Sequence, residues 1–259
     1  MDSRPIGIFD SGVGGTSIWQ EIHALLPNEN TIYLADSINA PYGLKGKARI
    51  QELCIKNTEY LLNESCKLIV VACNTATTNA IDVLRATYSV PFIGIEPAIK
   101  PAALQSKTGA IGILATKGTL SSALFHKTSN LFASDLHVVE QNGEGIVQLI
   151  EYGRLDSPEM HSLLVEYTKP MLEADIDHLV LGCTHYPYLI PQLINILPPH
   201  VKIIDSGEAV ARQTKSILSQ NNLLCDVRRT SSHQFLINSN PEVLRNLMGD
   251  QYDIRFVDF

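Results

Sequence analysis

The sequence predicts an α/β protein built from two similar lobes with mainly parallel sheets, related by pseudo-twofold symmetry, with a site in the cleft between them. Three observations support this fold. Short apolar runs alternate with amphipathic segments, which is typical of βαβ units. The whole pattern restarts near residue 111. Finally, Cys73 and Cys183 follow matching apolar runs and lie 110 positions apart.

The first half of the chain starts with an apolar run at residues 6–9, which predicts a buried strand followed by the glycine-rich segment 10–15. A helix is expected next, because Ile18 and Ile22 share a helical face with the leucines that precede Pro27. The remaining elements are predicted to be a strand at 31–36, a turn-rich loop at 39–43, a helix around 50–61, a strand at 69–72, a helix at about 77–88 and a strand at 92–97.

The second half repeats this order. Residues 111–114 match residues 6–9 at an offset of 105, and Thr116 falls where Ser11 stood. Further predicted elements are strands at 136–141, 179–182 and 201–206, and a helix that starts at Ser157 and Pro158. A helix at 208–218 and a last strand and helix within 235–248 have no counterpart before residue 111. We therefore predict a first lobe of residues 1–98 plus 207–259 and a second lobe of residues 99–206.

Composition excludes several classes of partner. The 259 residues carry a net charge of -7, whereas a nucleic-acid surface is usually basic. The apolar runs are too short to span a membrane, and we expect no signal peptide, because residues 1–5 lead straight into the first predicted strand. Five cysteines without a secretory context indicate reduced thiols. We expect a cytoplasmic protein that acts on a small molecule, with no nucleic-acid or membrane partner.

Polar residues follow the strands of both halves. In open α/β sheets, ligands bind beyond the carboxyl ends of the strands. If the lobes face each other at those ends, the polar residues converge in one cleft. They are Asp10, Ser11, Tyr42, Gly43, Cys73, Asn74, Thr75, Thr116, Cys183, Thr184 and His185.

Two opposed thiols in such a cleft could invert a carbon centre. A cysteine at the start of a helix is expected to have a lowered pKa, so that its thiolate acts as a base. One thiolate would remove a proton while the opposite thiol returns one from behind. Asp10 and His185 could move protons to and from the thiols, and the neutral donors around them could hold a carboxylate.

Plainer interpretations exist for each of these features. The two cysteines could be buried packing residues, as we expect for Cys54, Cys66 and Cys225. A zinc site would use cysteine and histidine, but no CxxC or HxxxH spacing supports one, so no metal is predicted. The loop after Asp10 matches neither a dinucleotide nor a Walker pattern.

Four motifs in this order resemble those of the glutamate racemase family, and the match covers almost the whole chain. They are Asp10-Ser11-Gly12-Val13-Gly14-Gly15, Pro41-Tyr42-Gly43, Cys73-Asn74-Thr75-Ala76-Thr77 and Gly182-Cys183-Thr184-His185-Tyr186-Pro187. The resemblance implies cofactor-independent interconversion of L- and D-glutamate, which supplies D-glutamate for peptidoglycan, and commonly a homodimer. One departure is Thr16, where the family more often has leucine.

The resemblance also implies residue roles. Cys183 would deprotonate L-glutamate and Cys73 would deprotonate D-glutamate, with Asp10 and His185 assisting. Glu151 matches an acidic position near the family's site, although it could also be a solvated helix residue. The substrate site would include Asp10, Ser11, Pro41, Tyr42, Gly43, Asn74, Thr75, Thr116, Thr184 and His185.

The sequence also has to be compared with the requirements of three rival functions: an aspartate racemase, an anion-binding protein and a pyridoxal phosphate racemase. An aspartate racemase would differ by one methylene of substrate, which is worth only ~1–3 kcal/mol of discrimination. A two-lobed anion-binding protein would need no thiols and would usually be exported. A pyridoxal phosphate racemase would need a Schiff-base lysine beside a phosphate-binding loop, and no lysine stands in such a place.

Overall fold

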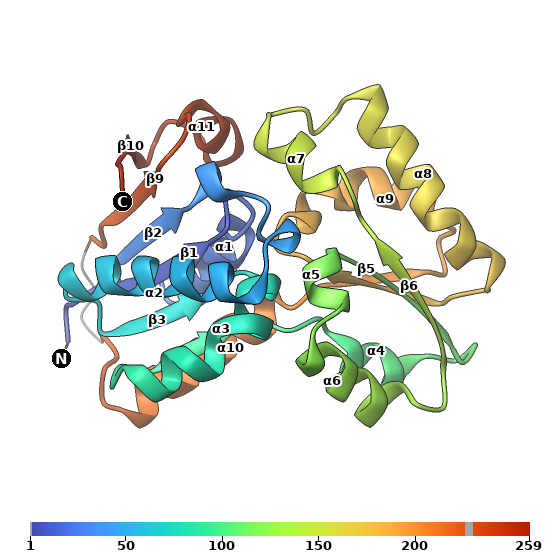
Figure 1. Cartoon of the computed structure of the whole chain (residues 1–259), viewed down its shortest axis with the longest axis horizontal. Helices are drawn as coiled ribbons and strands as arrows, with labels where there is room; N and C mark the ends of the chain where they lie inside the picture. Colours follow the sequence, from blue (N-terminus) through green and yellow to red (C-terminus); the bar gives the residue numbers. More distant parts are fainter. Residues whose placement is uncertain (1, 226–229) are drawn as a thin grey trace.

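The chain forms two parallel β-sheets side by side, each with helices on both faces (Figure 1). The computed structural model describes residues 2–225 and 230–259. Every strand pairing among these residues is parallel. The predicted fold class is therefore confirmed.

The first lobe is centred on a six-stranded sheet. In spatial order its strands are β10 (Asp253–Phe256), β9 (His233–Ile237), β2 (Thr31–Ala35), β1 (Ile6–Asp10), β3 (Leu68–Val71) and β4 (Phe92–Gly94). Its helices are α1 (Thr16–Leu25), α2 (Lys47–Asn63), α3 (Asn74–Thr87), α10 (Gly207–Gln220) and α11 (Glu242–Met248), with short 3₁₀ turns η1 (Ser37–Asn39) and η2 (Tyr42–Leu44).

Both faces of this sheet are apolar, as expected for a parallel sheet that helices cover on both sides. Successive side chains of a strand point to opposite faces. Ile8 packs in one cluster with Trp19 of α1, while its neighbour Phe9 packs in another with Leu53 of α2. The helices α1 and α10 lie together on the first of these faces, and α2 and α3 lie together on the second (Figure 1).

The second lobe is centred on a four-stranded sheet. Its strands in spatial order are β6 (His137–Asn142), β5 (Ala110–Ala115), β7 (His178–Gly182) and β8 (Lys202–Ile204). Its helical segments are α4 (Ile99–Gln105), α5 (Lys117–Leu120), α6 (Ala123–Ala133), α7 (Ile146–Glu151), α8 (Pro158–Glu173), η3 (Tyr186–Leu189) and α9 (Ile190–Ile196). The predicted start of α8 is confirmed, since Ser157 accepts a hydrogen bond from the Met160 N–H.

The predicted internal repeat is visible in the strand order. The run β2-β1-β3-β4 of the first sheet corresponds to β6-β5-β7-β8 of the second. The last part of the chain returns to the first lobe, where β9 pairs with β2 and α10 packs on α1. The division of the chain at residues 98 and 206 stays a prediction.

The secondary structure differs from the prediction in several details. Helix α3 begins at Asn74, not near residue 77, because Cys73 itself caps the helix. Strand β4 ends at Gly94 and does not reach residue 97. The edge strand β10 was not predicted.

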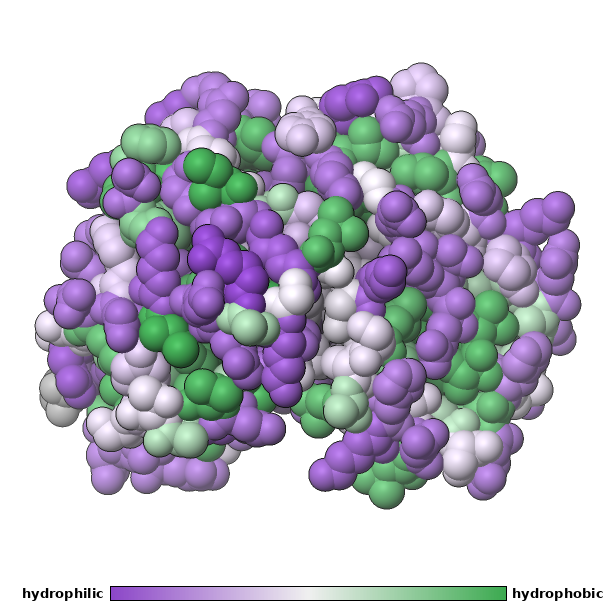
Figure 2. Space-filling model, viewed as in Figure 1, coloured by the Kyte–Doolittle hydropathy of each residue, from purple (hydrophilic) through white to green (hydrophobic). Residues whose placement is uncertain are grey.

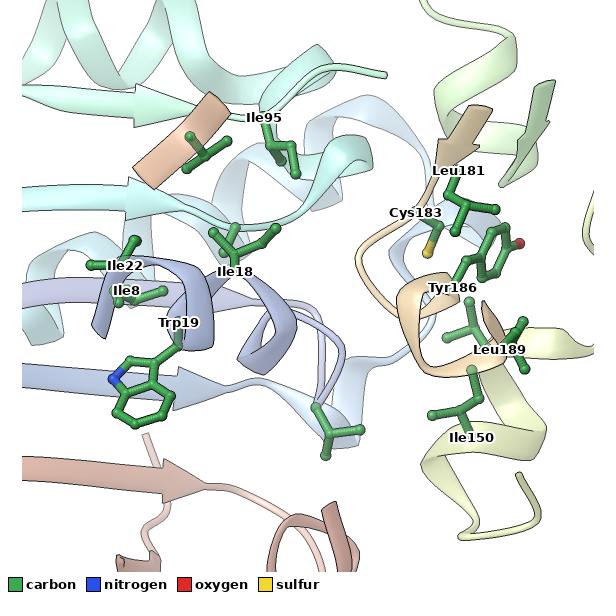
Figure 3. Close-up of a cluster of buried hydrophobic side chains, with 14 of the residues drawn as sticks. Ile8, Ile18, Trp19, Ile22, Ile95, Ile150, Leu181, Cys183, Tyr186 and Leu189 are labelled. Atoms are coloured by element: carbon green, nitrogen blue, oxygen red, sulfur yellow. The ribbon is translucent and has the colours of Figure 1, made fainter. Parts of the chain in front are cut away.

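One apolar cluster runs through both lobes. It joins Ile8, Ile18 and Trp19 of the first lobe to Leu181 and Tyr186 of the second (Figure 3). The face of the molecule seen in Figure 2 is mainly hydrophilic, with apolar residues scattered over both lobes. Among the residues that the structure describes, no helix has the length and apolar character needed to cross a membrane.

Candidate active site

The glycine-rich loop after β1 is organised by Asp10. This fully buried carboxylate accepts hydrogen bonds from the N–H groups of Gly12 (3.2 Å) and Gly15 (3.0 Å). Burial raises the pKa of Asp10 above its ordinary value, although the nearby His185 opposes this. A Cβ atom at Gly12 would collide with Glu151, and one at Gly14 would collide with His185. The loop is therefore glycine-rich because side chains from the other lobe approach its backbone closely.

Cys73 lies between β3 and α3 and is almost completely buried. Its Sγ accepts a hydrogen bond from the Ala76 N–H (3.4 Å), and its thiol donates to Ser11 Oγ (3.6 Å). Burial and the charge of Asp10 nevertheless raise the pKa of Cys73 well above its ordinary value. The expected lowering of the pKa by the helix start is wrong for this thiol, because desolvation outweighs one N–H donor.

Cys183 follows β7 and packs beside Leu181, Tyr186 and Leu189 (Figure 3). Unlike Cys73 it does not cap an α-helix, since the 3₁₀ turn η3 begins only at Tyr186. Its Sγ lies 3.8 Å from Nδ1 of His185. The two thiols therefore have different acid–base partners: Cys73 has a hydroxyl and a helix N–H, and Cys183 has an imidazole.

His185 is buried between Cys183 and Glu151. Its Nε2 lies 2.5 Å from Oε1 of Glu151, and its Nδ1 lies 4.0 Å from Oδ2 of Asp10. Burial would lower the pKa of His185, but the hydrogen bonds and charges of Cys183 and Glu151 raise it well above its ordinary value. The Gly14 N–H also points at Nε2 (3.2 Å). Since Nε2 cannot donate to Glu151 and accept from Gly14 at once, we assign a proton to the shorter contact.

A small cavity lies between the two thiols. Its lining residues come from both lobes and are Ser11, Pro41, Tyr42, Gly43, Cys73, Asn74, Thr75, Thr116, Val147, Cys183 and His185. Its free space is about 10 Å³, roughly what one water molecule needs. The lobes are therefore closed on each other in this structure.

Polar groups in the cavity differ in how they are satisfied. Both polar atoms of the Asn74 side chain are buried and have no hydrogen-bond partner. Thr75 and Thr116 hydrogen-bond to each other across the lobes (2.8 Å). The Tyr42 hydroxyl donates to Asp36 (2.5 Å), so it is not free for a ligand. Asn74 is therefore the side chain best prepared to receive a polar substrate.

The structure brings most of the predicted site residues to this cavity. Asp10, Thr184 and Glu151 lie behind its wall, where Thr184 donates a hydrogen bond to Asp10 (3.3 Å). Direct contact of Asp10 and Thr184 with substrate stays a prediction. Val147 was missed, because a buried valine in α7 carries no sequence signal that separates a cavity wall from the core. Within residues 2–225 and 230–259 there is no group of three or more His, Cys, Asp or Glu side chains placed to hold a metal ion.

Comparison with known proteins decides the family. The family described as Asp/Glu/Hydantoin racemase matches residues 6–214. A glutamate racemase of Ectopseudomonas mendocina is 48% identical over 225 residues, which covers 86% of each chain. The chain belongs to the glutamate racemase family.

Solved structures of glutamate racemases agree with this assignment. The Escherichia coli enzyme, in complex with L-glutamate and the activator UDP-MurNAc-ala, has a TM-score of 0.87 and 32% identity, covering 98% of this chain and 97% of its own. The Francisella tularensis enzyme, in complex with D-glutamate, has a TM-score of 0.84 and 29% identity, covering 100% of this chain and 98% of its own.

Proposed function

We propose that this protein interconverts L- and D-glutamate with two thiols as acid and base, and so supplies D-glutamate for peptidoglycan in the cytoplasm. One observation carries the proposal. Cys73 and Cys183 follow corresponding strands of the two lobes and line one cavity. The glutamate ligands named for the two solved relatives support the choice of substrate.

The surroundings of the thiols define the starting protonation state. Cys73 starts as a thiol, because burial and Asp10 raise its pKa. His185 starts protonated, because the hydrogen bonds and charges around it raise its pKa, and its positive charge lies 3.8 Å from Sγ of Cys183. We therefore propose a resting state with the acid on the Cys73 side and the base on the Cys183 side, as the assignment of Cys183 to L-glutamate requires.

This state is suited to L-glutamate. The Cys183 thiolate takes the α-proton, so that the Cα–H bond breaks and a carbanion forms. The Cys73 S–H then delivers its proton to the opposite face and leaves a Cys73 thiolate. The product is D-glutamate, and the enzyme is now in the protonation state that accepts D-glutamate. Proton exchange with water restores the first state.

Substrate would be held by neutral donors from both lobes. Ser11, Asn74 and Thr75 come from the first lobe, and Thr116 from the second. Their hydroxyl and amide groups suit carboxylates without adding a positive charge beside the carbanion. Because the closed cavity has room for about one water molecule, the lobes must open to admit glutamate.

The decisive assay follows the circular dichroism signal of glutamate, or measures D-glutamate with a coupled enzyme, without added cofactor. We expect the protein to racemise L-glutamate and the Cys73→Ser plus Cys183→Ser double variant to be inactive. Full activity of the double variant would refute the two-thiol mechanism.

Two further points rest on the family. Aspartate tests substrate choice, and we expect L-aspartate to be racemised much more slowly than L-glutamate in the same assay. We also propose a homodimer, which sedimentation equilibrium would detect as twice the 28.5 kDa chain mass.

A further inference from the structure

The carboxylate of Glu151 is held from both lobes. Glu151 ends α7 of the second lobe, and its Oε1 contacts His185 of the same lobe. The same oxygen accepts a hydrogen bond from the Val13 N–H of the first lobe (2.7 Å). Its other oxygen, Oε2, accepts a hydrogen bond from the hydroxyl of Ser37 (2.7 Å), which begins η1 of the first lobe.

We propose that Ser37 is a positioning residue for the proton transfer at Cys183. By holding Oε2, the Ser37 hydroxyl fixes the rotation of the carboxylate and keeps Oε1 in line with Nε2 of His185. His185 in turn faces Cys183. This inference deepens the proposed function and rests on it.

The turn that carries Ser37 is well anchored. Asn238 accepts a hydrogen bond from the Ile38 N–H (3.0 Å) and donates one to Asp36 (2.6 Å). Asp36 also accepts from the Asn39 side chain (2.8 Å). Because its neighbours on both sides are fixed, Ser37 presents its hydroxyl at a defined place across the cleft.

The arrangement makes the two thiols unequal. The hydrogen bonds of Cys73 go to Ser11 and Ala76, which belong to its own lobe and stay in place when the cleft opens. The chain from Cys183 through His185 and Glu151 is completed by first-lobe donors. It is therefore fully assembled only when the lobes are closed.

The test is Ser37→Ala, with Ser37→Thr as the variant that keeps the hydroxyl. We expect Ser37→Ala to lower kcat/KM about tenfold, since hydrogen bonds to charged groups are the stronger ones. We expect Ser37→Thr to recover most of that loss. Tyr188→Phe is the matched control, because it breaks another hydrogen bond between lobes, to Thr16 (2.6 Å), and leaves Glu151 untouched.

Isotope effects separate positioning from a general effect on closure. A racemase with an equilibrium constant of one must lose kcat/KM equally in both directions, so rates alone do not distinguish the thiols. In Ser37→Ala we expect the primary deuterium kinetic isotope effect on kcat/KM, measured with α-deuterated substrate, to rise for L-glutamate, whose α-hydrogen goes to Cys183. It should fall with D-glutamate, where Cys73 removes the deuterium. Tyr188→Phe should shift both effects alike.

A double-mutant cycle that combines Ser37→Ala with Glu151→Gln tests whether Ser37 acts through the Glu151 carboxylate. The Ser37→Ala change should cost much less in the Glu151→Gln background than in the native enzyme. Equal costs in both backgrounds, unchanged isotope effects, or parallel shifts with both enantiomers would overturn the proposal. In each case the native enzyme would still racemise glutamate, so the proposed function would stand. Loss of racemisation in the native enzyme would instead refute the function itself.

Discussion

The Asn74 side chain should lower the stability of the ligand-free protein and strengthen substrate binding. Its side chain is 3% exposed, and both its Nδ2 and its Oδ1 are buried without a partner. An unsatisfied buried polar group costs ~1–3 kcal/mol. Asn74→Ala removes two such groups and places a good helix former in the first turn of α3. We therefore expect the ligand-free variant to gain about 1 kcal/mol or more in unfolding free energy, which raises Tm by roughly 2–4 °C per kcal/mol.

The same substitution should weaken catalysis. A hydrogen bond from the amide to a substrate carboxylate is worth ~1.5–3 kcal/mol, or roughly a 10- to 150-fold loss of kcat/KM. Thermal unfolding followed by circular dichroism and initial racemisation rates measure the two effects.

Asn79 provides the control for this prediction. It lies on the same helix, but its Nδ2 donates to the Thr75 carbonyl (2.8 Å) and it does not line the cavity between the two thiols. Asn79→Ala removes an amide that already has a partner, so it should give a smaller gain in stability than Asn74→Ala and leave the kinetics unchanged. An Asn74→Ala variant that is less stable than the native protein, with kcat/KM within twofold, would refute the reasoning.

Two predictions concern regions outside the cleft. Lys67 and Glu29 form a fully buried ion pair (2.6 Å), so Lys67→Met should cost about 3–5 kcal/mol in unfolding free energy by leaving a lone buried charge. Chemical denaturation measures this loss, and kcat of the folded fraction should not change. Burial, with His23 nearby, lowers the pKa of His233 to about 4, below the unfolded value of ~6.5. The stability present above pH ~6.5 should therefore be lost as the pH falls toward 4. Because His233 is only partly buried, this pH-dependent part of the unfolding free energy is on the order of 1–2 kcal/mol. Between pH 7 and 5 the Tm of His233→Gln should therefore fall less than the Tm of the native protein. An equal fall in both proteins would contradict this assignment.

Much of the fold could be predicted because its elements have strong local signals. The buried strands are continuous apolar runs, and the repeat reveals the second sheet. Strand β10 escaped because it is an exposed edge strand in which Asp253 and Arg255 interrupt the apolar pattern. The early start of α3 escaped because cysteine is not among the usual capping residues.

The convergence of the strand-end residues on one cavity was predictable, but their electrostatics were less so. Strand ends brought Cys73, Asn74 and Cys183 together as expected. The raised pKa of Cys73 depends on its burial and on the nearby Asp10, and both are set by tertiary structure. Ser37 also had no signal in the sequence, because its importance lies in a contact with the other lobe.

The most direct test of the central claim follows deuterium entry at Cα in D₂O by proton NMR, using each single cysteine variant. A variant with one thiol can remove a proton and return deuterium only on one face. Cys73→Ser should therefore label L-glutamate without inversion, and Cys183→Ser should label D-glutamate. Equal labelling of both enantiomers by both variants, or racemisation at the native rate by either, would contradict the assignment of one thiol to each face.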